Sequence, residues 1–117
     1  MSVVLRRLAA AIALTGAAAA FTPDERQKNA IENISQVVAG AEKCDDWVLN
    51  EKLTAAISLA DGFRLTDEAT YAYIESRVLF HAERIRSRTR EDICAAMERL
   101  YGPEGSNVAD LALRVKK

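Results

Sequence analysis

The sequence predicts an all-α fold: a small antiparallel bundle of four to five helices with one disulfide, after a cleavable signal peptide. Three observations predict it. Apolar residues recur every three or four positions through several segments, which is the spacing of one face of a helix. Gly and Pro residues stand mostly between these segments, where helices end. The chain also has two cysteines, Cys44 and Cys94, which are available to pair.

The first twenty residues have the pattern of an export signal. Arg6 and Arg7 supply positive charge, and the uncharged run over residues 8–20 closes on small residues that suit a signal peptidase. This run has 13 residues, whereas a membrane-spanning helix needs about 20. We therefore expect residues 1–20 to be a signal peptide and residues 21–117 to form a single helical domain, with no stable membrane anchor after cleavage. An uncleaved anchor or a hydrophobic first helix is the alternative.

The first predicted helix of the domain begins at Thr22, which acts as N-cap while Glu25 completes a capping box. It is expected to weaken near Gly40. A second helix is predicted over residues 45–60, with a wide apolar face that needs more than one neighbour. Gly62 follows it as the expected helix end.

The third predicted helix starts after Thr66, its expected N-cap. One buried seam is predicted from residues at alternating spacings of three and four: Tyr71, Ile74, Val78, His81 and Ile85. Several arginines at the end of this helix suit the negative end of the helix dipole.

A fourth helix is predicted to begin at Thr89 and to stop at Gly102, which is followed by a proline. Asn107 is then expected to cap a short last helix that carries apolar residues as far as Val115.

Cys44 and Cys94 are expected to form a disulfide. An even number of cysteines behind an export signal favours a disulfide, and short connections make consecutive helices antiparallel neighbours, which brings both cysteines to the same end of the bundle. The bond should stabilise the fold by about 4 kcal/mol. The same geometry places Asp45 and Asp46 near the arginine-rich end of the third helix, where surface ion pairs are expected. Trp47 is expected to cover the disulfide.

Composition and motifs exclude several classes of function. Residues 21–117 hold 14 Lys or Arg against 17 Asp or Glu, a net charge of −3, which argues against a nucleic-acid binder. The chain has one His and no Cys-x-x-Cys pair, so we expect no metal site and no cofactor. No recognised catalytic motif is present, so we predict no catalytic residues and no enzyme activity.

Five residues of the third helix are candidates for function. Tyr73 and Phe80 lie seven residues apart, away from the predicted seam. They pack in the core if the helix is central, or expose an aromatic patch for a partner or a homodimer if it is peripheral. Arg84 and Arg88 either extend that partner surface toward an acidic group or simply complement the helix dipole. His81 is either a pH-sensitive group or a partly buried side chain with its polar edge satisfied.

Residues 44–48, Cys-Asp-Asp-Trp-Val, resemble the segment around the first cysteine of HdeA-type periplasmic acid-stress chaperones. Cys94 also stands at a similar distance and in a predicted helix. The resemblance implies a small exported helical protein that unfolds or dissociates at low pH and exposes apolar surface. The chain departs from that family in its capped helix before Cys44, its arginine-rich third helix and its short Lys116-Lys117 tail. As a whole it is similar to small uncharacterised exported proteins of Gram-negative bacteria, which implies a location and no activity.

We therefore expect a periplasmic or secreted protein that acts by binding a protein, either an unidentified partner or a second copy of itself. The alternative is an HdeA-like periplasmic stress chaperone.

Overall fold

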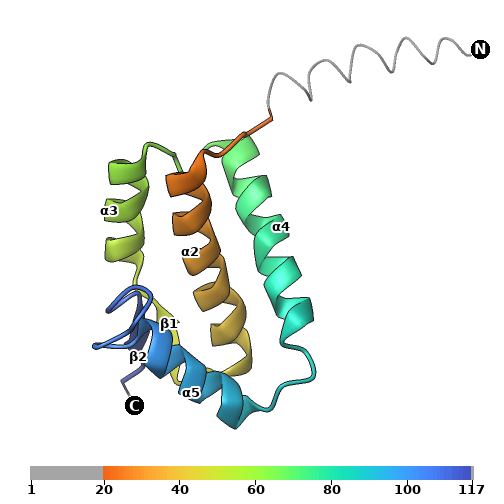
Figure 1. Cartoon of the computed structure of the whole chain (residues 1–117), viewed down its shortest axis with the longest axis vertical. Coiled ribbons are helices and arrows are strands. Elements are labelled where there is room, and N and C mark those ends of the chain that lie inside the picture. The colour runs from red at the N-terminus through yellow and green to blue at the C-terminus, as the bar shows by residue number, and fades with distance from the viewer. Residues whose placement is uncertain (1–19, 117) are drawn as a thin grey trace, which may run out of the picture.

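A layer of three helices, with a fourth helix across one end, makes up most of the part of the chain that the structure describes (Figure 1). The computed structural model describes residues 20–116. The predicted signal peptide lies outside the described residues, apart from Ala20. The elements in chain order are α2 (Glu25–Lys43), β1 (Trp47–Leu49), α3 (Glu51–Asp61), α4 (Glu68–Arg84), α5 (Arg90–Tyr101) and β2 (Ala112–Arg114). The prediction of a mostly helical protein with one disulfide is confirmed.

Helix α2 stands at the centre, between α3 and α4 (Figure 1). Helix α3 runs antiparallel to α2, as expected. The connection over residues 62–67 then crosses to the other side of α2, so α4 runs parallel to α2 and is not a close neighbour of α3. Helix α2 can serve both neighbours and α5 because its buried residues are distributed widely around it: Ala30, Ile31, Ile34, Ser35, Val37, Ala39 and Gly40.

The start of α2 has the predicted kind of cap, made by different residues. The Asp24 side chain accepts from the backbone N–H of Gln27 at 2.9 Å, and Gln27 Oε1 accepts from the backbone N–H of Asp24 at 3.0 Å. The helix does not weaken at Gly40. A Cβ atom there would lie 2.5 Å from Met97 Sδ, so the glycine allows α5 to pack closely across α2.

Two short strands replace predicted helical residues. The second helix begins at Glu51 and not near residue 45, because residues 47–49 pair antiparallel with residues 112–114. Asn50 fixes the boundary: its side chain accepts from the N–H of Leu53, and its own N–H donates to the Leu111 carbonyl at 2.8 Å. The predicted last helix from Asn107 to Val115 is therefore wrong.

The backbone ahead of β2 explains why no helix forms there. Asp110 has a φ of 66°, in the left-handed region that interrupts a right-handed helix. Its carbonyl accepts from the Asn50 side-chain amide at 2.9 Å, which ties this turn to the start of α3. The turn thereby directs the chain into the ribbon.

The remaining boundaries agree closely with the sequence. Gly62 ends α3 in the left-handed conformation, and Thr89 caps α5 by accepting from the Asp92 N–H at 3.1 Å. Helix α5 ends at Gly102. Helix α4 starts after Asp67, one residue later than the predicted cap at Thr66.

The predicted seam of α4 is only partly buried. Ile74 belongs to the buried core, and Val78, His81 and Ile85 are half-buried. Tyr71 is 59% exposed, so its assignment to the seam is wrong. The seam is incomplete because α4 packs on α2 along one side, and no other helix within residues 20–116 covers it (Figure 1). None of the described helices is long and apolar enough to cross a membrane.

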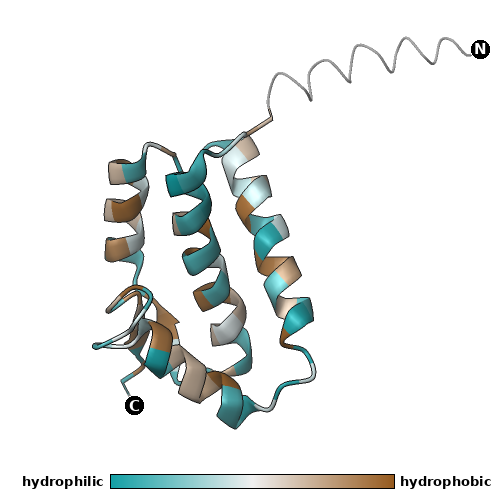
Figure 2. Ribbon diagram, viewed as in Figure 1, coloured by the Kyte–Doolittle hydropathy of each residue, from teal (hydrophilic) through white to brown (hydrophobic). Residues whose placement is uncertain are grey.

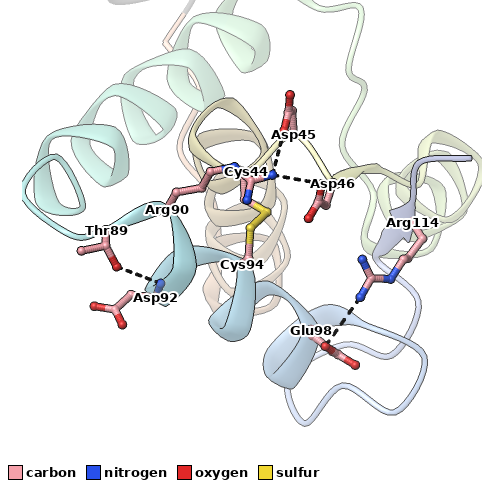
Figure 3. Close-up of a disulfide and its surroundings, with 9 residues drawn as sticks. All are labelled: Cys44, Asp45, Asp46, Thr89, Arg90, Asp92, Cys94, Glu98 and Arg114. Atoms are coloured by element: carbon pink, nitrogen blue, oxygen red, sulfur yellow. Dashed lines mark hydrogen bonds and ion pairs between the residues drawn. A yellow bond between two sulfur atoms is a disulfide. The ribbon is translucent and has the colours of Figure 1, made fainter. Parts of the chain in front are cut away.

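The disulfide between Cys44 and Cys94 is confirmed, with its Cα atoms 5.3 Å apart (Figure 3). Cys44 lies at the C-terminal end of α2 and Cys94 in the first half of α5. Beside the bond, the Arg90 guanidinium lies 3.1 Å from an Asp45 carboxylate oxygen and 3.0 Å from one of Asp46. The predicted ion pairs of these aspartates thus form with the first residue of α5, and not with the arginines at the end of α4.

Candidate functional site

Three of the predicted site residues line one groove. His81, Arg84 and Arg88 border a cavity of about 330 Å³ in the angle between α2, α4 and α5. The residues that complete its lining come from all three helices and the connection after α4: Gln36, Ala39, Gly40, Ile85, Ile93, Ala96, Met97, Leu100 and Tyr101. We call this cavity the α4–α5 groove.

The floor of the groove is apolar because α5 turns one face toward it. Ile93, Met97 and Leu100 recur at helical spacing along that face. Gly40 of α2 leaves the room that Met97 occupies. An apolar side chain of a ligand would be removed from water here, and that burial is favourable.

Polar groups stand on the α2 side of the floor. The Tyr101 hydroxyl hydrogen-bonds Gln36 Oε1 and lies 2.9 Å from Asn33 Oδ1, while the Asn107 amide donates to it at 3.3 Å. Burial raises the pKa of Tyr101, so the phenol keeps its proton. Gln36 and Tyr101 both line the groove and can exchange these bonds for bonds to a ligand.

The rim of the groove carries positive charge. Among the described residues, no carboxylate lies within ion-pair distance of Arg84, and no Asp or Glu lines the groove. The guanidinium of Arg88 is 3.7 Å from Asp92. An anionic group of a ligand would therefore meet Arg84 without displacing a carboxylate of the protein.

Phe80 extends this surface beyond the rim. The residue is 41% exposed, and the guanidinium carbons of Arg77 and Arg84 lie 4.2 Å and 5.7 Å from its ring centroid. Cation–π contacts of this kind hold an exposed aromatic ring in place. Tyr73, its predicted partner, lies elsewhere: it is half-buried and packs edge-on against Phe21, with ring centroids 5.5 Å apart. The structure thus separates the two aromatic residues that the sequence grouped together.

A clamp between α2 and α4 holds His81 at the edge of the groove. Arg77 donates to Glu32 through Nε at 2.6 Å and through Nη2 at 3.1 Å. His81 Nε2 donates to the same carboxylate at 2.6 Å. We call these three residues the Glu32 clamp. Burial works to raise the pKa of Glu32, but the hydrogen bonds from Arg77 and His81 outweigh it, so the pKa is lowered. The polar edge of His81 is therefore satisfied by an ionised carboxylate.

Several residues that matter here were not among the predicted site residues. Glu32, Gln36 and Tyr101 reach the site from α2 and α5 and belong to no motif. Tyr71, which was predicted to be buried, is 59% exposed on α4, and Leu79 on the same helix is 67% exposed. Only the folded arrangement distinguishes exposed apolar residues from core residues.

One cluster has the residue types of a metal site. Sulfur atoms of Cys44 and Cys94 and a carboxylate oxygen of Asp46 lie within 4.8 Å of one another. The two sulfurs are bonded to each other, and a disulfide lacks the thiolates that bind zinc. Asp46 also pairs with Arg90 (Figure 3). In the oxidised protein this cluster therefore offers a metal ion a single carboxylate ligand, that of Asp46.

The α4–α5 groove combines an apolar floor, hydrogen-bonding groups on one side and cations at its rim. These features suit the binding of a group that is apolar in part and carries a negative charge. Comparison of the chain with protein-family models, with curated proteins and with solved structures finds no match.

Proposed function

We propose that this chain is an exported protein, periplasmic or secreted, that acts by binding another protein through the α4–α5 groove and the adjacent Phe80. The observation that carries the proposal is the position of Arg84, a cation without a carboxylate partner among the described residues, between an exposed aromatic ring and an apolar groove. Aromatic residues, Met and Arg are the types that protein interfaces favour.

Two further features support this role. The disulfide is typical of proteins outside the reducing cytosol, in agreement with the export signal predicted from residues 1–20. The groove lining has one His, which is held by Glu32, and no Ser, Cys or Thr that this His could activate as a nucleophile. Binding without catalysis is therefore our proposal.

Site-specific photo-cross-linking in the native cell tests the binding role. A photoreactive amino acid at position 80 should give one defined protein adduct, and an added Arg84→Glu change should abolish it. The matched control carries the same group at position 71, which is also exposed on α4 but does not border the groove. Equal adducts from both positions, or no dependence on Arg84, would contradict the proposal. An adduct of twice the chain mass identifies the partner as a second copy.

The Glu32 clamp favours a second candidate, an HdeA-like stress chaperone. Protonation of Glu32 would remove the charge that holds Arg77 and His81, and with it part of the attachment of α4 to α2. Release of α4 would expose apolar core residues such as Ile74. Circular dichroism and oligomeric state that stay unchanged down to strong acid would exclude this candidate.

A further inference from the structure

The α4–α5 groove has dimensions that define the size of its ligand. The apolar part of the α5 wall extends from Ile93 to Leu100, seven residues apart, so it is about 10 Å long at a rise of about 1.5 Å per residue. An extended peptide covers this length in about three residues, at about 3.3 Å each. The volume of about 330 Å³ is roughly twice that of a 150 Å³ cavity that holds one benzene ring. The groove therefore has room for about two bulky apolar side chains.

The charges at the rim define the polar part of the ligand. Arg84 and Arg88 stand at the α4 side, and the described lining contains no carboxylate. Asp92 approaches Arg88 at 3.7 Å and leaves Arg84 as the stronger anchor. A ligand carboxylate at Arg84 would form a charge-assisted hydrogen bond, and it would be shielded on one side by Phe80.

The polar groups of the lining favour a peptide over an acyl chain. Gln36 Oε1 and the Tyr101 hydroxyl already bond each other, but among the described residues no hydrogen bond uses the side-chain NH2 of Gln36. A hydrocarbon tail would cover this donor without bonding it, and burial of an unpaired polar group is unfavourable. A peptide backbone carries both donors and acceptors, which the Gln36 amide and the Tyr101 hydroxyl can bond.

From these observations we infer that the α4–α5 groove binds an extended acidic–apolar segment of a partner protein: an Asp or Glu side chain at Arg84, next to two bulky apolar side chains over Met97. This inference rests on the proposed protein-binding function and names the chemistry of the partner segment.

Capped model peptides test the carboxylate requirement. The first probe is glycine-glutamate-leucine-phenylalanine-glycine, blocked at both ends, and the second has glutamine in place of glutamate. Titrations are followed by NMR on the exported, disulfide-bonded protein. The glutamate peptide should shift the amide signals of Gly40, Ala96 and Met97, and the glutamine peptide should bind about tenfold more weakly.

A cycle of protein variants assigns that difference to Arg84. The variant Arg84→Gln should bind both peptides with equal affinity, whereas Arg99→Gln should keep the tenfold difference, because Arg99 lies on α5 outside the groove lining. Ala96→Leu should fill the groove and abolish binding of both peptides. Ala95→Leu, one residue away and exposed, is the matched control and should bind as the parent does.

Three outcomes would overturn the inference: equal affinity of the two peptides for the parent protein, a tenfold difference that persists in Arg84→Gln, or tighter binding of octanoate than of the glutamate peptide. The cross-linking experiment separates this failure from failure of the proposed function. An Arg84-dependent adduct at position 80, combined with no peptide binding, would leave the binding role standing and remove the acidic–apolar segment. If peptide binding and the cross-linked adduct are both absent, the proposed protein-binding function and the inference about the acidic–apolar segment are both wrong.

Discussion

The two sides of α2 are held together by different chemistry. On the α5 side the contact is largely apolar and is also covalent: Ile93, Met97 and Tyr101 are buried, and the disulfide joins the C-terminal end of α2 to the first half of α5. On the α4 side only Thr70 and Ile74 are buried. Polar contacts between α4 and α2 replace much of the missing apolar burial. Figure 2 shows hydrophilic and hydrophobic residues intermixed along α4.

Two sets of hydrogen bonds fasten α4 to α2. The Glu32 clamp acts at its middle, and at its end the Lys43 ammonium donates to the carbonyls of Ile85 at 3.2 Å and Arg86 at 2.6 Å. Such bonds depend on charge and therefore on pH, whereas the packing around Met97 does not. The comparison teaches that α5 supplies stability, while α4 presents exposed apolar and cationic side chains that the fold does not use.

Loss of the disulfide should have the largest effect. Cys94→Ser removes a link between residues 50 positions apart, and the chain-entropy model gives a loss of about 4 kcal/mol in the free energy of unfolding. Urea denaturation measures this loss, and reduction of the parent protein should reproduce it. The exposed neighbour Ala95→Ser serves as control. A loss below about 1 kcal/mol would show that apolar packing alone holds the α5 side.

Glu32→Gln should destabilise the α4 side by about 1.5 kcal/mol at neutral pH, because the amide loses the charge-assisted bonds to Arg77 and His81 while Glu32 is only partly buried. Urea denaturation compares it with Glu42→Gln, an exposed change on the same helix that should cost almost nothing.

The same variant should also flatten the acid dependence of stability. The pKa of Glu32 is lowered from its ordinary value of 4.5 in the folded protein, so the unfolded chain takes up this proton first as the pH falls. The stabilisation is therefore present above pH 4.5 and is lost as the pH falls through the folded-state pKa. If the difference in free energy of unfolding between the parent protein and Glu32→Gln stays constant from pH 7 to pH 3, the ionised Glu32 carboxylate does not stabilise the fold as described.

Tyr101→Phe should lower the free energy of unfolding by about 1 kcal/mol, because the buried ring remains while the hydrogen bonds of the hydroxyl to Asn33 and Gln36 are lost. Thermal or urea unfolding measures the change. Tyr71→Phe is the matched control, since its exposed hydroxyl bonds water in either state. Equal effects of the two changes would mean that the hydroxyl network contributes nothing to the α5 side.

Leu79→Ser should have the smallest effect, within about 0.5 kcal/mol, because the side chain is 67% exposed. Ile74→Ala on the same helix should cost at least about 2 kcal/mol, since Ile74 is one of the few buried residues of α4. A large loss for Leu79→Ser in urea denaturation would show that the outer face of α4 is covered in solution.

Parts of the candidate site followed from the sequence, and parts did not. The sequence predicted a partner surface of Tyr73, Phe80, Arg84 and Arg88 and considered His81 separately, as a pH-sensitive group. The structure places His81, Arg84 and Arg88 around one groove. Their closeness in the chain favours this, because they lie within eight positions at the end of α4 and just after it. Which way Tyr73 and Phe80 face depends on the neighbours of α4, and the sequence left both orientations open. The clamp partner Glu32 lies 45 residues before Arg77, so no local pattern connects them.

The sequence by itself determined the four helices, the ends of α3 and α5, and the pairing of Cys44 with Cys94. Helical spacing, caps and helix-ending glycines act within a few residues, and two cysteines allow only one intramolecular bond. Tertiary structure alone decided the β ribbon, the position of α4 across α2 from α3, and the groove. Each of these joins segments far apart in the chain, and three-residue strands such as Trp47–Leu49 are too short for their periodicity to differ from that of a helix.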